Sequence, residues 1–187
     1  IVALDIGDNV KMSLKAIEEI RDEAEYPGLR ASIQTEFDGI TNMLKLDMTT
    51  GDIIVPKEIT YEFKLMFEDR ILKVKAYNIE TVLAEKIETI ITRSTANTRM
   101  RDYYDVYIIM TMYKDLVNND LLNDAIIKVS ENRDTTYVLK DKTTILKEIA
   151  NSVQMQHRWE RYQSKYSYAK EIQWNDIIIV LKEYNGG

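Results

Sequence analysis

The spacing of the apolar residues changes partway along the chain, and this change limits the folds open to it. In the first part, apolar residues recur mainly at every second position, as at Leu29, Ala31 and Ile33, which is typical of strands with one buried face. Further on they recur every third or fourth position, as in amphipathic helices. We therefore predict an α+β protein, with an antiparallel or mixed sheet domain over residues 1–77 and a helical domain over residues 78–187.

The individual elements can be placed from the same pattern and from turn signals. We expect strands at 29–37 and 40–49, a turn at 49–52, and a short helix at 14–25 capped by Ser13. The downstream part is expected to hold helices at residues 79–94, 99–113, 119–131, 141–153, 155–170 and 174–184. Their ordinary lengths favour a single bundle.

Composition excludes several classes of protein. The 187 residues include no cysteine, so disulfides, Cys-ligated zinc and thiol nucleophiles are excluded. No apolar run approaches the roughly 20 residues needed to span a bilayer, and we expect a cytoplasmic protein with no membrane contact. The net charge of −6 disfavours a surface coated with basic residues, so any contact with RNA must be local.

Two of the expected helices carry charged side chains on their apolar faces. Lys86 falls within the apolar arc of the helix at 79–94, and Asp102, flanked by Asp105, falls within that of the next helix. An unpaired buried ammonium costs several kcal/mol, so Lys86 needs an anion close by. That anion could be Asp102 or Asp105, in an ion pair that fixes helix packing, or a phosphate-bearing ligand in a polar cleft. The spacing leaves both interpretations open.

The strand at 40–49 places Lys45 and Asp47 on one face, because side chains alternate along a strand. A solvated face of an antiparallel sheet is the simpler interpretation. The pair gains importance only together with the charged helix residues, with which it could line a cleft between sheet and bundle.

Three sequence blocks resemble the AbiEii/AbiGii family of nucleotidyltransferase toxins. They are KLDMTTGD at 45–52, ETVLAEKIETIITR at 80–93 and NTRMRDYYDVY at 97–107, in the family's order and spacing. The similarity runs over residues 1–113 and fades downstream. Because the family shares the fold of polymerase-β-like nucleotidyltransferases, the resemblance implies a nucleotidyltransferase-like sheet.

The family's first block is a Gly-Ser turn followed by a D-x-D strand, and the resemblance implies that it is missing here. Asp5 and Asp8 do not replace it, because residues an odd number of positions apart point to opposite faces of a strand. We therefore expect an N-terminally truncated member whose residues 1–14 follow the missing block. A two-metal site would then be incomplete and the 187-residue chain itself inactive.

The matched blocks imply roles for individual residues. Asp47 corresponds to a metal-directed carboxylate, and Lys86 to a lysine at the nucleotide phosphates. The fourth block, usually R-x-K-D-x-x-D, is matched except that Arg101 replaces the lysine, keeping the charge but offering no deprotonatable base. The catalytic candidates are thus Asp47, Lys86, Asp102 and Asp105, and the nucleotide-binding candidates are Lys45, Lys86, Arg99 and Arg101.

The chemistry implied by the resemblance is nucleotide transfer. Mg²⁺ bridges carboxylates and a nucleoside triphosphate, an acceptor hydroxyl attacks the α-phosphorus, and pyrophosphate leaves. The acceptor in related toxins is RNA, often tRNA, and the setting is a toxin–antitoxin or phage-abortive-infection system with an antitoxin protein as partner.

A second class of function stays open, that of a relative that binds RNA or an antitoxin without catalysis. Basic and aromatic residues alternate near the C-terminus, in the order Arg158, Trp159, Arg161, Tyr162, Lys165, Tyr166, Tyr168 and Lys170. Such a segment could hold RNA or a protein, or its aromatic residues could simply pack inward.

Overall fold

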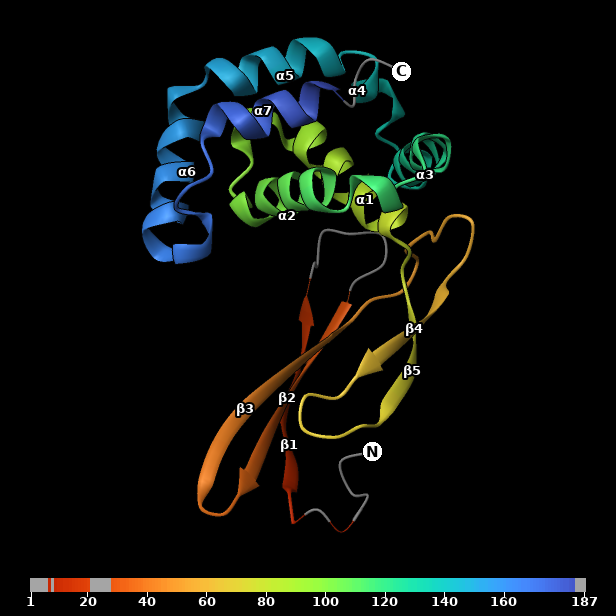
Figure 1. Ribbon diagram of the computed structural model, residues 1–187, viewed down its shortest axis with the longest axis vertical. Coiled ribbons are helices and arrows are strands. Elements are labelled where there is room, and N and C mark those ends of the chain that lie inside the picture. The colour runs from red at the N-terminus through yellow and green to blue at the C-terminus, as the bar shows by residue number, and fades with distance from the viewer. Residues whose placement is uncertain (1–6, 8, 21–27, 184–187) are drawn as a thin grey trace. The chain divides into compact units, whose positions relative to one another are not determined.

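The structure is a computed structural model that describes residues 7, 9–20 and 28–183 (Figure 1). Two compact units make up the chain, Ile1–Asp52 and Ile53–Gly187. Antiparallel sheets of three and two strands are followed by helices, which confirms the predicted α+β class. Asp5 and Asp8, discussed above, lie outside the described residues.

The first unit is a sheet in the strand order β1–β2–β3, with the strands spanning Lys11–Ile20, Gly28–Phe37 and Ile40–Met48. Both predicted strands are therefore present. They are joined by Asp38 and Gly39, whose φ angles of 47° and 77° give the two-residue turn that matches the twist of a hairpin.

The helix predicted at 14–25 is wrong, because β1 covers residues 11–20 and the remainder of that range lies outside the described residues. Leu14 and Ile17 are three positions apart, which is a helical spacing. In the structure the pairing with β2 shifts between Leu14 and Ala16. Such an irregularity adds one residue to a strand, so Leu14 and Ile17 fall opposite Ile33 and Ala31 on one face of the sheet.

The strand register gives this sheet two unlike faces. One face is apolar, because β2 and β3 pair Leu29 with Met48, Ala31 with Leu46, and Ile33 with Leu44. On the other face Arg30 lies opposite Asp47, and Ser32 lies opposite Lys45. Lys45 and Asp47 therefore share the polar face, as alternation predicted.

The second unit begins with the antiparallel pair β4 (Ile59–Lys64) and β5 (Ile71–Ala76), followed by α1 (Ile79–Arg93). The predicted change from strands to helices thus falls between β5 and α1. Whether residues 1–77 and 78–187 act as domains stays a prediction, since β4 and β5 belong to the same compact unit as the helices.

Asn78 fixes the start of α1. Its side-chain oxygen accepts a hydrogen bond from the Thr81 backbone N–H at 2.7 Å, and its amide donates to the Val55 carbonyl. The Thr81 hydroxyl accepts from the Val55 N–H at 3.0 Å. The first turn of α1 is therefore capped and at the same time bound to the segment before β4.

The remaining helices are α2 (Met100–Met112), α3 (Asn119–Asn132), α4 (Thr136–Leu139), α5 (Lys142–Asn151), α6 (Val153–Lys165) and α7 (Trp174–Glu183). All six predicted helices are present, and residue 184 lies outside the described range. The short α4 was not predicted. The predicted helix at 155–170 ends early, because Tyr166 is extended and a 3-10 turn at Ser167–Ala169 follows.

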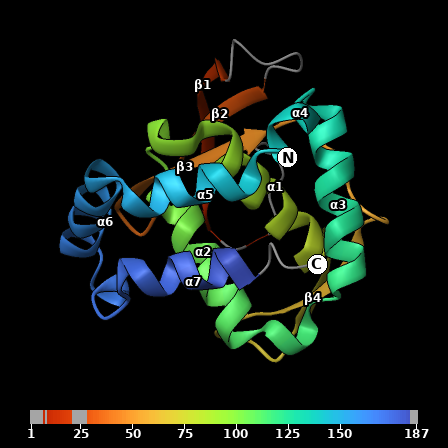
Figure 2. The ribbon, with the colours of Figure 1, turned by 90° about the horizontal axis from the view of Figure 1, so that it is seen from above.

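The core of the second unit lies among these helices. In Figure 2, α1 lies between α2 and α3, and it packs against both. The largest fully buried side chains include those of Leu83, Ile90, Tyr103, Trp159 and Ile177. Among the residues described, no helix is both long enough and apolar enough to cross a membrane.

Candidate functional site

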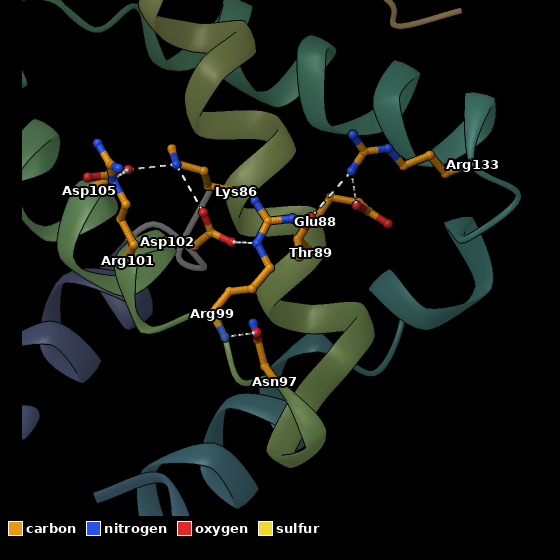
Figure 3. Close-up of polar contacts among 9 residues, drawn as sticks. All are labelled: Lys86, Glu88, Thr89, Asn97, Arg99, Arg101, Asp102, Asp105 and Arg133. Atoms are coloured by element: carbon orange, nitrogen blue, oxygen red, sulfur yellow. Dashed lines mark hydrogen bonds and ion pairs between the residues drawn. The ribbon is translucent and has the colours of Figure 1, made fainter. Parts of the chain in front are cut away.

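Lys86 of α1 lies between two carboxylates of α2 (Figure 3). Its Nζ is 3.0 Å from Oδ1 of Asp102 and 2.7 Å from Oδ2 of Asp105. The two acids are three positions apart, and such residues share one face of a helix. The expectation that Lys86 lies beside an anion is therefore confirmed, with both candidate acids as its partners.

Two arginines complete what we call the ion-pair cluster, namely Lys86, Arg99, Arg101, Asp102 and Asp105. The Nε of Arg99 is 2.9 Å from Oδ2 of Asp102, and the Nε of Arg101 is 3.8 Å from Oδ2 of Asp105. Exposure increases outward, from 4% for the Asp102 side chain to 51% for Arg99 and 79% for Arg101. The carboxylates thus lie inside, while both guanidinium groups reach solvent. With three cations and two carboxylates, the cluster carries an excess of one positive charge.

Local structure explains why Asp102 is held inside. It lies in the first turn of α2, where a carboxylate is favoured by the positive end of the helix dipole. The loop before α2 is fixed by Asn97, whose side-chain oxygen accepts from the Arg99 backbone N–H at 2.8 Å. The backbone of Arg99 is therefore fixed, and its side chain extends from there to Asp102.

These contacts bear on both interpretations of Lys86. The ion pairs that would fix helix packing are present. The solvent-exposed guanidinium groups beside them have the planar donor geometry that binds phosphate oxygens in pairs. A nucleotide-directed role for Lys86 stays a prediction.

Asp47 lies in the first unit and has a partner that the sequence did not indicate. Both of its carboxylate oxygens accept from Arg30, at 2.6 Å from Nε and 2.7 Å from Nη2. The hydrogen bond and the charge of Asp47 raise the pKa of Arg30. Arg30 could be recognised only from the strand register, which places it directly opposite Asp47. That Asp47 and Lys45 act together with the ion-pair cluster stays a prediction.

The described residues do not fit a magnesium site by themselves. Within residues 7, 9–20 and 28–183, no three His, Cys, Asp or Glu side chains are grouped so that they could hold a metal ion. Magnesium prefers several oxygen ligands, whereas Asp47 offers one carboxylate that is bonded to Arg30 through both oxygens.

A second buried carboxylate, Glu88 of α1, is fully engaged in packing. Its side chain is 3% exposed and accepts hydrogen bonds from Arg133 at 2.6 Å, Thr135 at 2.8 Å and Thr92 at 2.9 Å. Figure 3 shows Arg133 reaching it from the end of α3. Arg133 and Thr135 tie α1 to the segment after α3, and Thr92 holds the carboxylate from within α1, so Glu88 is structural rather than a catalytic candidate.

Two residues of the basic and aromatic segment near the C-terminus are held by contacts inside the second unit. Nη1 of Arg158 donates to the carbonyls of Thr95 at 2.6 Å and Asn97 at 2.9 Å. Trp159 is 1% exposed and donates to the Ile172 carbonyl at 2.9 Å. Arg158 therefore supports the loop before α2, and Trp159 belongs to the core.

Comparison with known families identifies a family that matches most of the chain. The model of the family described as "Nucleotidyl transferase AbiEii toxin, Type IV TA system" matches residues 3–178. The match reaches into α7, so the similarity does not fade after residue 113 as the sequence blocks suggested. Comparisons with curated proteins and with solved structures give no significant match.

Proposed function

Because the chain belongs to the AbiEii family of nucleotidyltransferase toxins of type IV toxin–antitoxin systems, we propose that the protein transfers a nucleotide from a nucleoside triphosphate to an RNA acceptor such as tRNA. The acceptor hydroxyl attacks the α-phosphorus, the bond from that phosphorus to the bridging oxygen breaks, and pyrophosphate leaves. An antitoxin protein that neutralises the activity, cytoplasmic action and a role in abortive phage infection belong to the same proposal.

One observation carries the proposal: residues from two separate sequence blocks meet in the ion-pair cluster. Lys86 comes from the block at 80–93, whereas the two arginines and two aspartates come from the block at 97–107. The ion pairs of Lys86 with Asp102 and Asp105 join the two blocks. Lys86, Arg99 and Arg101, which the family resemblance assigns to the nucleotide, thus share the same two aspartates.

The cluster has properties that suit a triphosphate. Arg99 and Arg101 present their guanidinium groups to solvent, and the excess positive charge favours an approaching anion. Asp102 holds Lys86 and Arg99 in place from the buried side. A group positioned before the substrate arrives stabilises developing charge without further reorganisation.

Magnesium enters the proposal through the family alone. Asp47 is the candidate ligand, and nucleotidyl transfer commonly uses Mg²⁺ to bind the triphosphate. Because Asp47 is bonded to Arg30, a metal ion would have to replace that contact, and no further ligand is assigned among the described residues. Lys45 is a candidate for the same nucleotide on the same face.

A transfer assay with the full-length gene product tests the proposal. The protein is incubated with Mg²⁺, an RNA pool and each nucleoside triphosphate in turn, labelled on the α-phosphate. We expect labelled RNA with at least one nucleotide, and release of pyrophosphate in step with the label. RNA binding without label under any of these conditions would instead favour the non-catalytic relative.

A further inference from the structure

Four tyrosine side chains gather beside the ion-pair cluster. We call this group the tyrosine cluster: Tyr104 of α2, Tyr162 of α6, and Tyr166 and Tyr168 in and next to the 3-10 turn that follows α6. Ring centroids are 4.8 Å apart for Tyr104 and Tyr168 and 4.7 Å apart for Tyr162 and Tyr166. The hydroxyl oxygens of Tyr162 and Tyr168 are 3.0 Å apart. The rings are therefore held in fixed positions.

The tyrosine cluster has a buried floor and an open outer side. Beneath it, the ring of Trp159 stacks on Tyr162 with centroids 5.3 Å apart and planes 22° apart. Trp159 is 1% exposed, whereas Tyr168 is 54% exposed. Core packing explains the inner rings. It does not explain why a tyrosine occupies the exposed position 168.

The tyrosine cluster adjoins the ion-pair cluster. Tyr104 is the sequence neighbour of Asp105. Burial is the main cause that raises the pKa of Tyr162, followed by its contact with Tyr168, and charges on Asp105 and Arg101 also act on it. A ligand on the open rings would therefore lie close to the groups proposed to hold the triphosphate.

The charge around the tyrosine cluster is positive although the whole chain is acidic. Residues 153–170 contain four basic residues and one acidic residue, in a chain of net charge −6. The Nζ of Lys165 is 5.3 Å from the centroid of the Tyr166 ring. Arg161 is exposed on the same helix. Aromatic faces with cations at their edge are the combination that binds single-stranded nucleic acids.

We propose that the tyrosine cluster binds an unpaired base of the RNA acceptor, which stacks on Tyr168 while Lys165 and Arg161 contact its phosphates. The inference rests on the proposed function only in taking the acceptor to be RNA. Single-stranded RNA is favoured over a protein partner because the exposed ring is accompanied by local positive charge, and over a duplex because paired bases hide their faces.

Equilibrium binding without any nucleoside triphosphate tests the inference. The probe is a fluorescein-labelled single-stranded oligoadenylate of about ten nucleotides, and binding is followed by fluorescence anisotropy. Tyr168→Ala should weaken binding about tenfold, since base stacking on an aromatic ring contributes enough for that change. Tyr168→Phe keeps the ring and should bind within about twofold of the wild type. Tyr137→Ala, which removes a tyrosine that is 70% exposed on α4, is the matched control and should change nothing.

A second measurement does not depend on any variant folding. An oligouridylate carrying iodouridine is crosslinked by light to the wild-type protein, and the adduct is located by mass spectrometry. We expect the crosslink on Tyr168 or Tyr166.

The inference is overturned if Tyr168→Ala binds as tightly as the wild type, if Phe weakens binding as much as Ala, or if the crosslink lies outside the tyrosine cluster. Equal or tighter binding of a duplex of the same length also overturns it. If the full-length gene product transfers no nucleotide but binds oligoadenylate through Tyr168, the proposed function is refuted and this inference stands. If it transfers nucleotide but its binding of oligoadenylate does not depend on Tyr168, this inference is refuted and the proposed function stands.

Discussion

Asp102 is the most buried side chain of the ion-pair cluster. Its side chain is 4% exposed and lies within 3.0 Å of Lys86 and 2.9 Å of Arg99. A buried carboxylate is tolerated only with such partners. Asp105 shares Lys86 but is 24% exposed, and its second cation, Arg101, is 3.8 Å away. Water therefore competes with the ion pairs of Asp105 far more effectively than with those of Asp102.

This difference predicts unequal effects on stability. Asp102→Asn should lower the free energy of unfolding by about 3 kcal/mol, because it removes the carboxylate that two cations share in a nearly dry site. Asp105→Asn should cost about 1 kcal/mol, because its environment is partly solvated. Urea unfolding of the two variants measures both values. Equal losses would show that burial does not set the energetics of this cluster.

The charged residues also show what a sequence can reveal about a site. The helical period predicted that Lys86 would need an anion, because the pattern placed it among apolar residues within one element. Arg30 was missed because its contact with Asp47 depends on the register between two strands. For Arg158 the sequence left binding and packing open, because its partners, the carbonyls of Thr95 and Asn97, are more than 60 positions away in the sequence.

Among the elements, the helices were predictable and β1 was not. Helical contacts are local, so the apolar period alone located α1, α2, α3, α5, α6 and α7. In β1 the irregularity at Leu14 and Ala16 imitates helical spacing, and only pairing with β2 reveals a strand. The early end of α6 also depends in part on a contact between residues far apart in the sequence. Tyr166 packs on Tyr162, and Tyr168 packs on the distant Tyr104, rather than continuing the helix.

The start of α1 makes a testable case at this scale. Asn78→Ala should lower the free energy of unfolding by about 2 to 3 kcal/mol, because both a helix cap and a buried hydrogen bond to the Val55 carbonyl are lost. The matched control is Asn118→Ala, which removes an exposed cap of α3, accepting from the Leu121 N–H at 3.1 Å. That change should cost about 1 kcal/mol. If both variants lose the same stability, the bond to Val55 contributes nothing.

At the scale of the whole molecule, the two units differ in how much they bury. The core cluster of buried apolar residues runs from Val55 to Leu181 and lies entirely in the second unit. Among the described residues of the sheet β1–β3, only Gly28, Ala31 and Ile33 are buried. Stability should therefore be unevenly distributed along the chain.

Hydrogen exchange followed by mass spectrometry measures this distribution. Amides of β1–β3 should exchange through openings of lower free energy than amides of α1 and α3, since fewer apolar contacts are lost when the sheet opens. Equal protection of β2 and α1 would contradict this expectation.

Stability should also fall in alkali, because burial raises the pKa of Tyr103 above its usual range. Because the pKa of Tyr103 is higher in the folded state than in the unfolded state, this residue's contribution to the free energy of unfolding is fully present below about pH 10. It is lost as the pH rises further. The free energy of unfolding should then fall by up to about 1.4 kcal/mol per pH unit for this group.

The matched comparison is between Tyr103→Phe and Tyr137→Phe, in urea unfolding at about pH 9 and about pH 11. The first variant should lose less stability than the wild type on going to the higher pH. The second, which changes an exposed tyrosine, should behave as the wild type. An unchanged pH dependence in Tyr103→Phe would show that its phenol is not protected by folding.

Whether the ion-pair cluster faces a nucleotide is decided most directly by Lys86→Met in the full-length gene product, with transfer measured per folded molecule. Asp102 keeps Arg99 and Asp105 keeps Arg101 in this variant, so neither carboxylate is stranded and the loss of stability should be about 1 to 2 kcal/mol. Transfer of nucleotide to RNA should fall at least about 100-fold, because a positioned charge at the phosphates is gone. Unchanged transfer per folded molecule would mean that Lys86 is a packing residue and that the nucleotide binds elsewhere.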